Sequence, residues 1–167
     1  MKLMSVNIED LRSLYISNLK KALDMERKIT KALPELIDKS TDSELTSAFR
    51  THLEETKGHV SKVEQLLQKN AREKATETCK AIDGLTTEAS DTIKDVTNPS
   101  LRNVALIGAA QQVEHHEIAV YGTLRRWADL LGLTDDARVL LSIEKEEVNA
   151  DQILTQISEH VNVQAAA

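Results

Sequence analysis

The stretch VALIGAAQQVEHHEIAVYGTLRRWA, at residues 104–128, decides how the chain folds. Its inward positions recur every three or four residues, which is the spacing of one face of an α-helix. These positions are Val104, Ile107, Gln111, Glu114, Ile118, Tyr121 and Ala128. We therefore expect one long helix, whose buried face is apolar except where an amide and a carboxylate interrupt it.

Similar stripes cover most of the remaining sequence, and none shows the alternation typical of a strand. The spacing predicts helices over about residues 7–38, 41–69, 80–96, 99–131 and 134–160, with a polar loop over 70–79. Pro34 predicts a kink or an early stop in the first helix. Thr41 and Glu44 have the spacing of a capping box, and Gly132 is placed to end the fourth helix. We expect residues 161–167 to fray.

The chain of 167 residues contains only five Gly and two Pro, which favours an all-α protein. Its length suits a single domain over residues 1–167. Four of the predicted helices are long and one is short, and the short one lies between the second and third long helices. That long connection is typical of the ferritin-like four-helix bundle. An up-down bundle with short loops competes with it, but residues 71–99 are too many for a short loop.

Composition excludes several classes of protein. The formal net charge of −6 argues against a nucleic-acid-binding protein, which needs a cationic face. The sequence has no apolar run long enough for a membrane span, and its first residues do not form a secretory signal. Cys79 is the single cysteine, so no internal disulfide can form. We expect a cytoplasmic protein.

Each long helix carries a carboxylate or an imidazole near the middle of its apolar stripe. A buried carboxylate costs several kcal/mol unless it is paired or bound to a cation. Four helices that place such groups at one level predict a shared cation site, and carboxylates with some imidazole suit iron or manganese. The candidate ligands are Glu26, Glu55, His59, Glu114, Glu117, Glu147 and Asp151.

Four further residues are candidates for supporting these ligands. His52 lies one turn before Glu55 or Thr56, and it is either a hydrogen-bond donor to the site or a core histidine with its own partner. Tyr121 either donates a hydrogen bond or packs in the core, and Gln111 and Glu144 lie on the same stripes. Any one of the candidate carboxylates alone is more often solvated or salt-bridged. Their occurrence on four stripes together is what predicts a site.

Several stretches resemble the YciE/YciF-type family of bacterial ferritin-like stress proteins, formerly a domain of unknown function. They are MERK at residues 25–28, HLEETKGH at 52–59, AAQQVEHHEIA at 109–119, YGTL at 121–124, and EE at 146–147 with AD at 150–151. The resemblance implies a homodimer with a dinuclear metal centre in the bundle core. It matches Glu26, Glu55, Glu114 and Glu147 to the family's core carboxylates, with His59, Glu117 and Asp151 as further ligands.

The sequence departs from ferritin-like sites at large, which use Glu-x-x-His on two helices. Thr56 stands three residues before His59, and Asp151 stands where a histidine would follow Glu147. The site is therefore richer in carboxylate, which leaves open whether iron, manganese or no metal binds.

Two functions follow as expectations. The first is a non-haem protein with two iron or manganese ions, iron being favoured, that acts on hydrogen peroxide or dioxygen during stress. Catalase-like, peroxidase-like and ferroxidase-like chemistry all fit it, and iron storage is a weaker variant. The second is a metal-free dimeric bundle with a structural or interaction role, in which a carboxylate–histidine network specifies the packing of the helices.

Overall fold

The computed structural model describes residues 8–166, and this part of the chain forms helices and no strand. The helices are α1 (Leu11–Lys39), α2 (Ser43–Ala71), α3 (Lys80–Asp95), α4 (Pro99–Leu130) and α5 (Thr134–Ala166). The predicted all-α class, with four long helices and a short one in the second connection, is confirmed.

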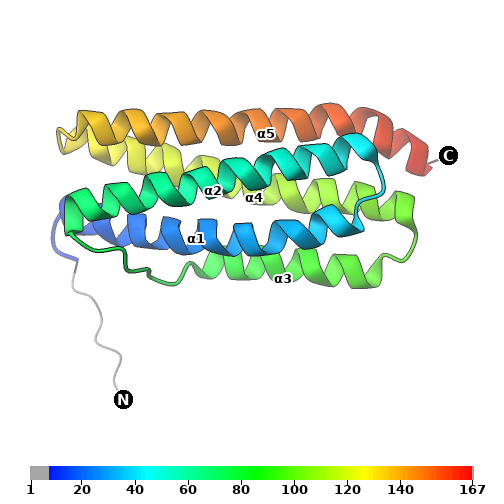
Figure 1. Cartoon of the computed structure of the whole chain (residues 1–167), viewed down its shortest axis with the longest axis horizontal. Helices are drawn as coiled ribbons and strands as arrows, with labels where there is room; N and C mark the ends of the chain where they lie inside the picture. The colour runs from blue at the N-terminus through cyan, green and yellow to red at the C-terminus, as the bar shows by residue number, and fades with distance from the viewer. Residues whose placement is uncertain (1–7, 167) are drawn as a thin grey trace, which may run out of the picture.

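The four long helices form two antiparallel pairs, α1 with α2 and α4 with α5, which pack side by side (Figure 1). The connection that contains α3 returns the chain from the end of α2 to the start of α4. On the way, α3 packs along the outside of α1 and α4. This is the ferritin-like arrangement, because the crossover joins the second and third long helices.

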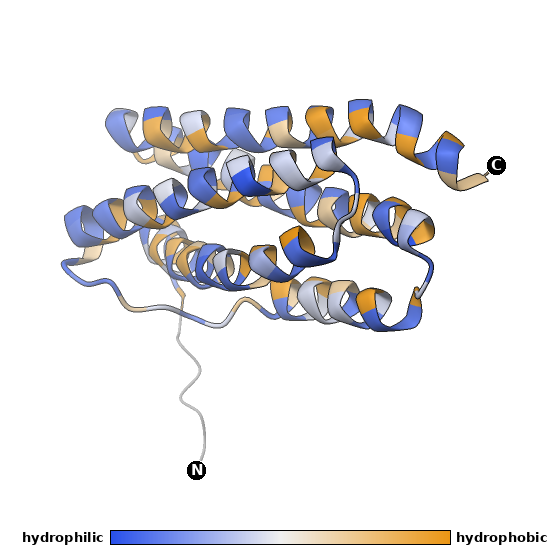
Figure 2. Cartoon of the chain, turned by 45° about the vertical axis from the view of Figure 1, so that its right-hand side comes forward, coloured by the Kyte–Doolittle hydropathy of each residue, from blue (hydrophilic) through white to orange (hydrophobic). Residues whose placement is uncertain are grey.

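Hydrophobic and hydrophilic residues are interspersed along every helix, as the orange and blue on the ribbons show (Figure 2), and hydrophobic residues of each helix face the interior. The apolar sides meet in one continuous core that receives residues from all five helices. Within residues 8–166, no helix is both long and apolar enough to cross a membrane.

The start of α2 differs from the predicted capping box. Asp42, and not Thr41, caps the helix, because its side chain accepts a hydrogen bond from the backbone N–H of Leu45 at 2.9 Å. The backbone N–H of Thr41 donates instead to the side chain of Asn103 at 2.9 Å. Nδ2 of Asn103 also donates to Thr41 Oγ1 at 2.9 Å, so a contact with α4 occupies the side chain of the alternative capping residue.

The start of α1 also differs from its prediction. The helix begins at Leu11, after Asp10, whose side chain accepts a hydrogen bond from Ser13 N at 2.7 Å. Asn7, the predicted start, lies outside the described residues. Pro34 does not stop the helix early, since α1 continues to Lys39. The ring of Pro34 is on the exposed side of α1, where water can satisfy the carbonyl that loses its helical donor.

Gly132 ends the α4 turn with a φ of 71°, in the left-handed region that glycine favours, as predicted. The expectation that residues 161–167 fray is wrong as far as residue 166, because α5 continues to Ala166. Val161 packs in the core and keeps this end of the helix in place. Ala167 lies outside the described residues.

Candidate metal centre

Six titratable side chains meet in the interior of the bundle, and none of them is more than 6% exposed. They come from all four long helices: Glu26 from α1, His52 and His59 from α2, Glu114 and Glu117 from α4, and Glu147 from α5. His52 and His59 are seven residues apart, so two turns of α2 separate them on one face. Glu114 and Glu117 are three residues apart and point from one face of α4.

Around His52 the closest groups are carboxylates. Its Nε2 lies 3.2 Å from Glu114 Oε1 and 3.9 Å from Glu147 Oε2. Its Nδ1 lies 3.6 Å from Glu55 Oε2. The imidazole therefore faces three acidic groups from three helices.

His59 faces the other side of Glu147. Its Nδ1 lies 2.9 Å from Glu147 Oε1 and 3.7 Å from Glu26 Oε2. Its Nε2 contacts Glu146 Oε2 at 2.5 Å, and Lys62 in turn donates to Glu146 Oε1 at 3.1 Å. The outward nitrogen of the ring is thus held by a partner near the surface, while the inward nitrogen points at the cluster.

Hydrogen bonding inside the cluster is incomplete. Nine buried nitrogen and oxygen atoms of these six side chains have no hydrogen-bond partner, and they are all such side-chain atoms in the described part of the chain. Both oxygens of Glu117 and both of Glu147 are among them. Even the 2.9 Å contact between His59 and Glu147 lacks hydrogen-bonding geometry. In native proteins nearly all buried polar atoms have hydrogen-bond partners. A concentration of buried nitrogen and oxygen atoms without partners therefore needs a cause, such as a bound cation.

The pKa values of the four buried carboxyl groups also point to a bound cation. Burial raises the pKa of Glu26, Glu114 and Glu117, and the neighbouring carboxylates raise the pKa of Glu114 and Glu117 further. Burial also opposes ionisation of Glu147, but the two imidazoles outweigh it and hold the pKa of Glu147 below its ordinary value.

The two imidazoles respond in the opposite direction. Burial alone would lower the pKa of both imidazoles. The surrounding carboxylates outweigh it and raise the pKa of His52 to about 9 and that of His59 to about 11. Without a cation, the cluster can balance its charge only by keeping extra protons on imidazoles and carboxyls.

The donor atoms fall into two groups that share Glu147. One group is His52, Glu114, Glu117 and Glu147, and the other is Glu26, His59 and Glu147. Within each group, one donor atom from each residue lies within 4.8 Å of the others. Unpaired carboxylate and imidazole atoms in two adjacent groups fit two divalent cations, and this mixture of donors suits iron or manganese.

A protein-family model described as a domain of unknown function, DUF892, matches residues 10–167. The chain belongs to the DUF892 family. It is 35% identical to the protein YciF of Escherichia coli strain K12, over 92% of this chain and 93% of YciF.

Solved structures of the family have the same fold. The crystal structure of the E. coli stress protein YciF matches with a TM-score of 0.88 at 33% identity, over 92% of this chain and 98% of that one. YcfI from Rhodopseudomonas palustris, described as a candidate structural protein, matches with a TM-score of 0.88 at 35% identity and the same coverage. These likenesses agree with the ferritin-like expectation for the fold.

Two of the predicted ligands lie outside both donor groups of this DUF892 chain. Glu55 is at the edge of the cluster beside His52, with 31% of its side chain exposed. Asp151 accepts a hydrogen bond from Gln111 Nε2 at 3.2 Å and lies 3.4 Å from Nδ1 of the exposed His115. Metal ligation by either carboxylate stays a prediction, as it does for Glu26, His59, Glu114, Glu117 and Glu147.

Of the other predicted supporting residues, one contacts the donor groups and two have partners outside them. Tyr121 is fully buried and donates a hydrogen bond to Glu26 Oε1. Gln111 bonds to Asp151 and to Thr155 Oγ1, away from the donor groups. Glu144 is occupied by Arg125, whose Nε donates to it at 2.7 Å.

Sequence reasoning underestimated two residues. His52 belongs to one of the donor groups, and its signal was the spacing of seven residues from His59 on the same face of α2. Glu146 holds the outward nitrogen of His59. No local pattern marks this role, because it depends on how α2 and α5 pack together.

Proposed function

We propose that this chain is a dinuclear non-haem iron or manganese protein, with iron favoured, that acts on hydrogen peroxide or dioxygen in a stress response. The observation that carries the proposal is the set of nine unpartnered donor atoms in two groups joined by Glu147. The likeness to YciF, whose crystal structure is described as that of a stress protein, supports the physiological setting. A cytoplasmic location and a homodimer complete the proposal.

The six buried side chains would hold the ions, and Glu147 belongs to both donor groups. Glu55, at the edge of the cluster beside His52, is a further candidate ligand. When bound, a pair of iron or manganese ions would supply the electron transfer that reduction of peroxide or dioxygen requires.

The chain's own residues have three tasks in this proposal. Glu146 and Lys62 fix the ring of His59, so that its inward nitrogen stays aimed at the cluster. Tyr121 holds one oxygen of Glu26 with its hydroxyl proton and leaves the other oxygen free. The six side chains are at most 6% exposed, and this burial strengthens the electrostatic interactions among them.

Elemental analysis of protein from cells supplied with iron and manganese tests the proposal. We expect about two ions per chain, as in two-metal sites generally. Glu147→Gln should lose most of both ions, because the residue is common to both groups. Glu159→Gln is the matched control on the exposed side of the same helix and should keep them. A wild-type protein without metal would overturn the proposal.

Turnover is measured on the same samples. Metal-loaded wild-type protein should consume hydrogen peroxide, or consume dioxygen when given ferrous iron, and Glu147→Gln should not. If the protein binds about two ions yet consumes neither oxidant, the metal site stands and the redox function does not.

A metal-free structural role is the second candidate, favoured by the ion pairs that already link the imidazoles to carboxylates. YcfI, described as a candidate structural protein, is consistent with it. In this case the network would specify the packing of the helices, and the dimer would act through a partner. Protein that remains metal-free after growth with iron and manganese, yet is a stable dimer in solution, would favour this candidate.

A further inference from the structure

A cavity of about 410 Å³ lies inside the bundle, next to the buried cluster. All five helices contribute to its wall, and the wall is largely apolar. Six of the apolar side chains are Ile29, Leu33, Leu36, Phe49, Leu154 and Ile157. The volume is within the range of about 300–1,000 Å³ that is typical of sites for small molecules.

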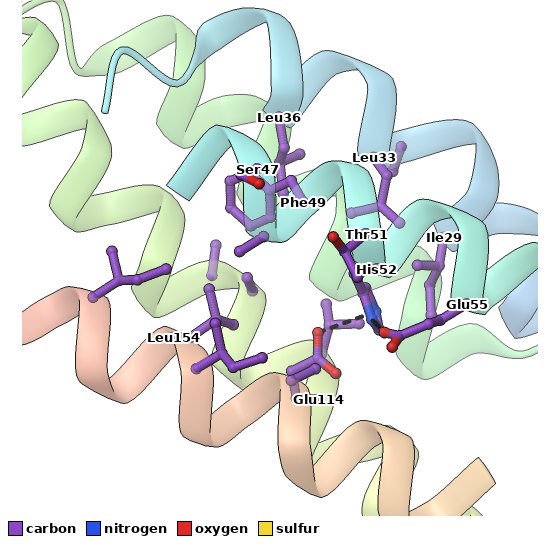
Figure 3. Close-up of a pocket in the computed structure, with 18 of the residues that line it drawn as sticks. Ile29, Leu33, Leu36, Ser47, Phe49, Thr51, His52, Glu55, Glu114 and Leu154 are labelled. Atoms are coloured by element: carbon purple, nitrogen blue, oxygen red, sulfur yellow. Dashed lines mark ion pairs between the residues drawn. The ribbon is translucent and has the colours of Figure 1, made fainter. Parts of the chain in front are cut away.

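The cavity has one polar end. His52, Glu55 and Glu114 lie together there, while the labelled apolar side chains line the rest of the space (Figure 3). Both ring nitrogens of His52 and Oε2 of Glu114 are buried without a hydrogen-bond partner. The cavity and the candidate metal centre therefore share His52 and Glu114.

The cavity also has an opening to solvent between α2 and α5. Ser47 and Thr51 of α2 and Gln156 of α5 line it and are exposed on the surface. A ligand can thus enter between two helices and reach the polar end without displacement of a helix.

We propose that this cavity binds an aliphatic molecule of about ten carbons that carries an uncharged hydroxyl-type head group. An apolar cavity of about 150 Å³ holds benzene, so this one has room for roughly ten to fifteen non-hydrogen atoms. The aliphatic chain lies along the apolar wall, and the head group reaches His52 and Glu114. This inference goes beyond the proposed function and does not depend on bound metal.

The chemistry of the polar end selects the head group. His52 is surrounded by Glu55, Glu114 and Glu147 at 3.6, 3.2 and 3.9 Å, so acidic groups outnumber the imidazole. A carboxylate head would bury its own charge beside the three carboxyl groups that face His52, and it is disfavoured. A hydroxyl can donate to Glu114 and accept from His52, and so supplies partners that both side chains lack.

Isothermal titration calorimetry of the full chain, freed of metal with a chelator, tests the proposal. We expect saturable binding of 1-decanol, and an affinity that rises roughly fourfold for each methylene added between 1-hexanol and 1-decanol. Decanoate, with the same chain length and a charged head, should bind at least about tenfold more weakly than decanol. Absence of saturable decanol binding overturns the site, and equal binding of decanoate overturns the choice of head group.

Two variants and a control locate the binding. Ala109→Leu fills the cavity from α4 and should weaken decanol binding about tenfold or more. Ala105→Leu, one turn earlier on α4 and outside the cavity lining, is the matched control and should bind as wild type does. Thr51→Trp narrows the exposed opening without touching the core, and so gives a second test if Ala109→Leu does not fold.

Unchanged affinity in both cavity variants would overturn the assignment. Because no metal is present, decanol binding is independent of the metal content that tests the proposed function. Decanol binding without metal binding would support the cavity and contradict the metal centre. Metal binding without decanol binding would support the metal centre and contradict the cavity.

Discussion

Buried carboxylates occur in two regions of this molecule, and their surroundings differ. Near the start of α5, Asp136 is fully buried and every one of its oxygens has a partner. Its Oδ1 accepts from Lys69 at 2.7 Å, and its Oδ2 accepts from Asn70 at 2.6 Å and from the hydroxyl of Tyr15 at 3.2 Å. In the middle of the bundle, Glu117 is equally buried and neither of its oxygens has a partner.

Burial alone therefore does not distinguish a structural carboxylate from a candidate metal ligand. The distinction lies in the partners: a satisfied buried group adds to stability, whereas an unsatisfied one costs about 1–3 kcal/mol, and more when it is charged. Asp136 ties α1, α2 and α5 together. The central cluster has nine buried atoms without a hydrogen-bond partner. Burying them destabilises the folded state unless a cation or additional protons provide the missing partners.

The strongest test of this contrast is thermal unfolding with and without metal. Metal at about one hundred times its dissociation constant stabilises a folded protein by about 2.7 kcal/mol. For a chain of this size we expect Tm to rise by about 5–10 °C on addition of Fe²⁺ without oxygen, or of Mn²⁺. Glu147→Gln should lose most of the increase, whereas Asp136→Leu should keep it from a lower starting Tm. An equal increase in Glu147→Gln would contradict the assignment of the shared ligand.

Matched leucine substitutions compare the two regions directly. In metal-free protein, Asp136→Leu should lower the free energy of unfolding by about 2–4 kcal/mol, since Tyr15 and Asn70 lose a buried acceptor. Glu117→Leu should raise it by about 1–3 kcal/mol, because an unpaired buried carboxylate is removed. Urea denaturation at neutral pH in the presence of a chelator measures both. Equal destabilisation by the two changes would remove the contrast.

A smaller effect is expected in the pH dependence of the metal-free protein. Burial raises the pKa of Glu114 and Glu117, so the folded state holds their protons more tightly, and stability falls as pH rises above their ordinary range. His52, with its pKa raised to about 9, contributes stability that is complete below about 6.5 and is lost as pH rises through 9.

Both effects have the same sign, so metal-free protein should be less stable at pH 9 than at pH 6. Thermal unfolding over this range measures the slope. Bound metal should reduce the fall, because it replaces the protons in the cluster. A metal-free protein that becomes more stable between pH 6 and pH 9 would contradict these protonation states.

The helices could be predicted from the sequence because their signals are local. Apolar spacing located five helices, and Gly132 located the end of α4. The start of α2 was wrong by one residue, since Thr41 and Asp42 are both good caps. The choice between them depends on Asn103, which is more than sixty positions away in the chain.

The structure brings together those predicted residues at which the interruption of a stripe is also a buried position. Glu26, Glu114 and Glu147 lie at such positions, and the structure brings them together. Asp151 has the right helical spacing from Glu147, yet it turns towards Gln111 and His115 on α4. Spacing locates a residue on a helix face, and the neighbouring helix then decides whether its side chain points inward or along the interface.

Glu144 provides the smallest effect and the finest test of the comparison. It lies one turn before Glu147 on the inward side of α5, but Arg125 occupies it at 2.7 Å, so it resembles Asp136 in having a partner. Glu144→Gln should therefore leave the metal content unchanged and lower the free energy of unfolding by no more than about 1 kcal/mol, as is usual for a partly exposed ion pair. Elemental analysis and urea denaturation measure the two quantities. Loss of metal in this variant would show that a carboxylate with a partner also supports the centre, and the rule drawn from Asp136 and Glu117 would then fail.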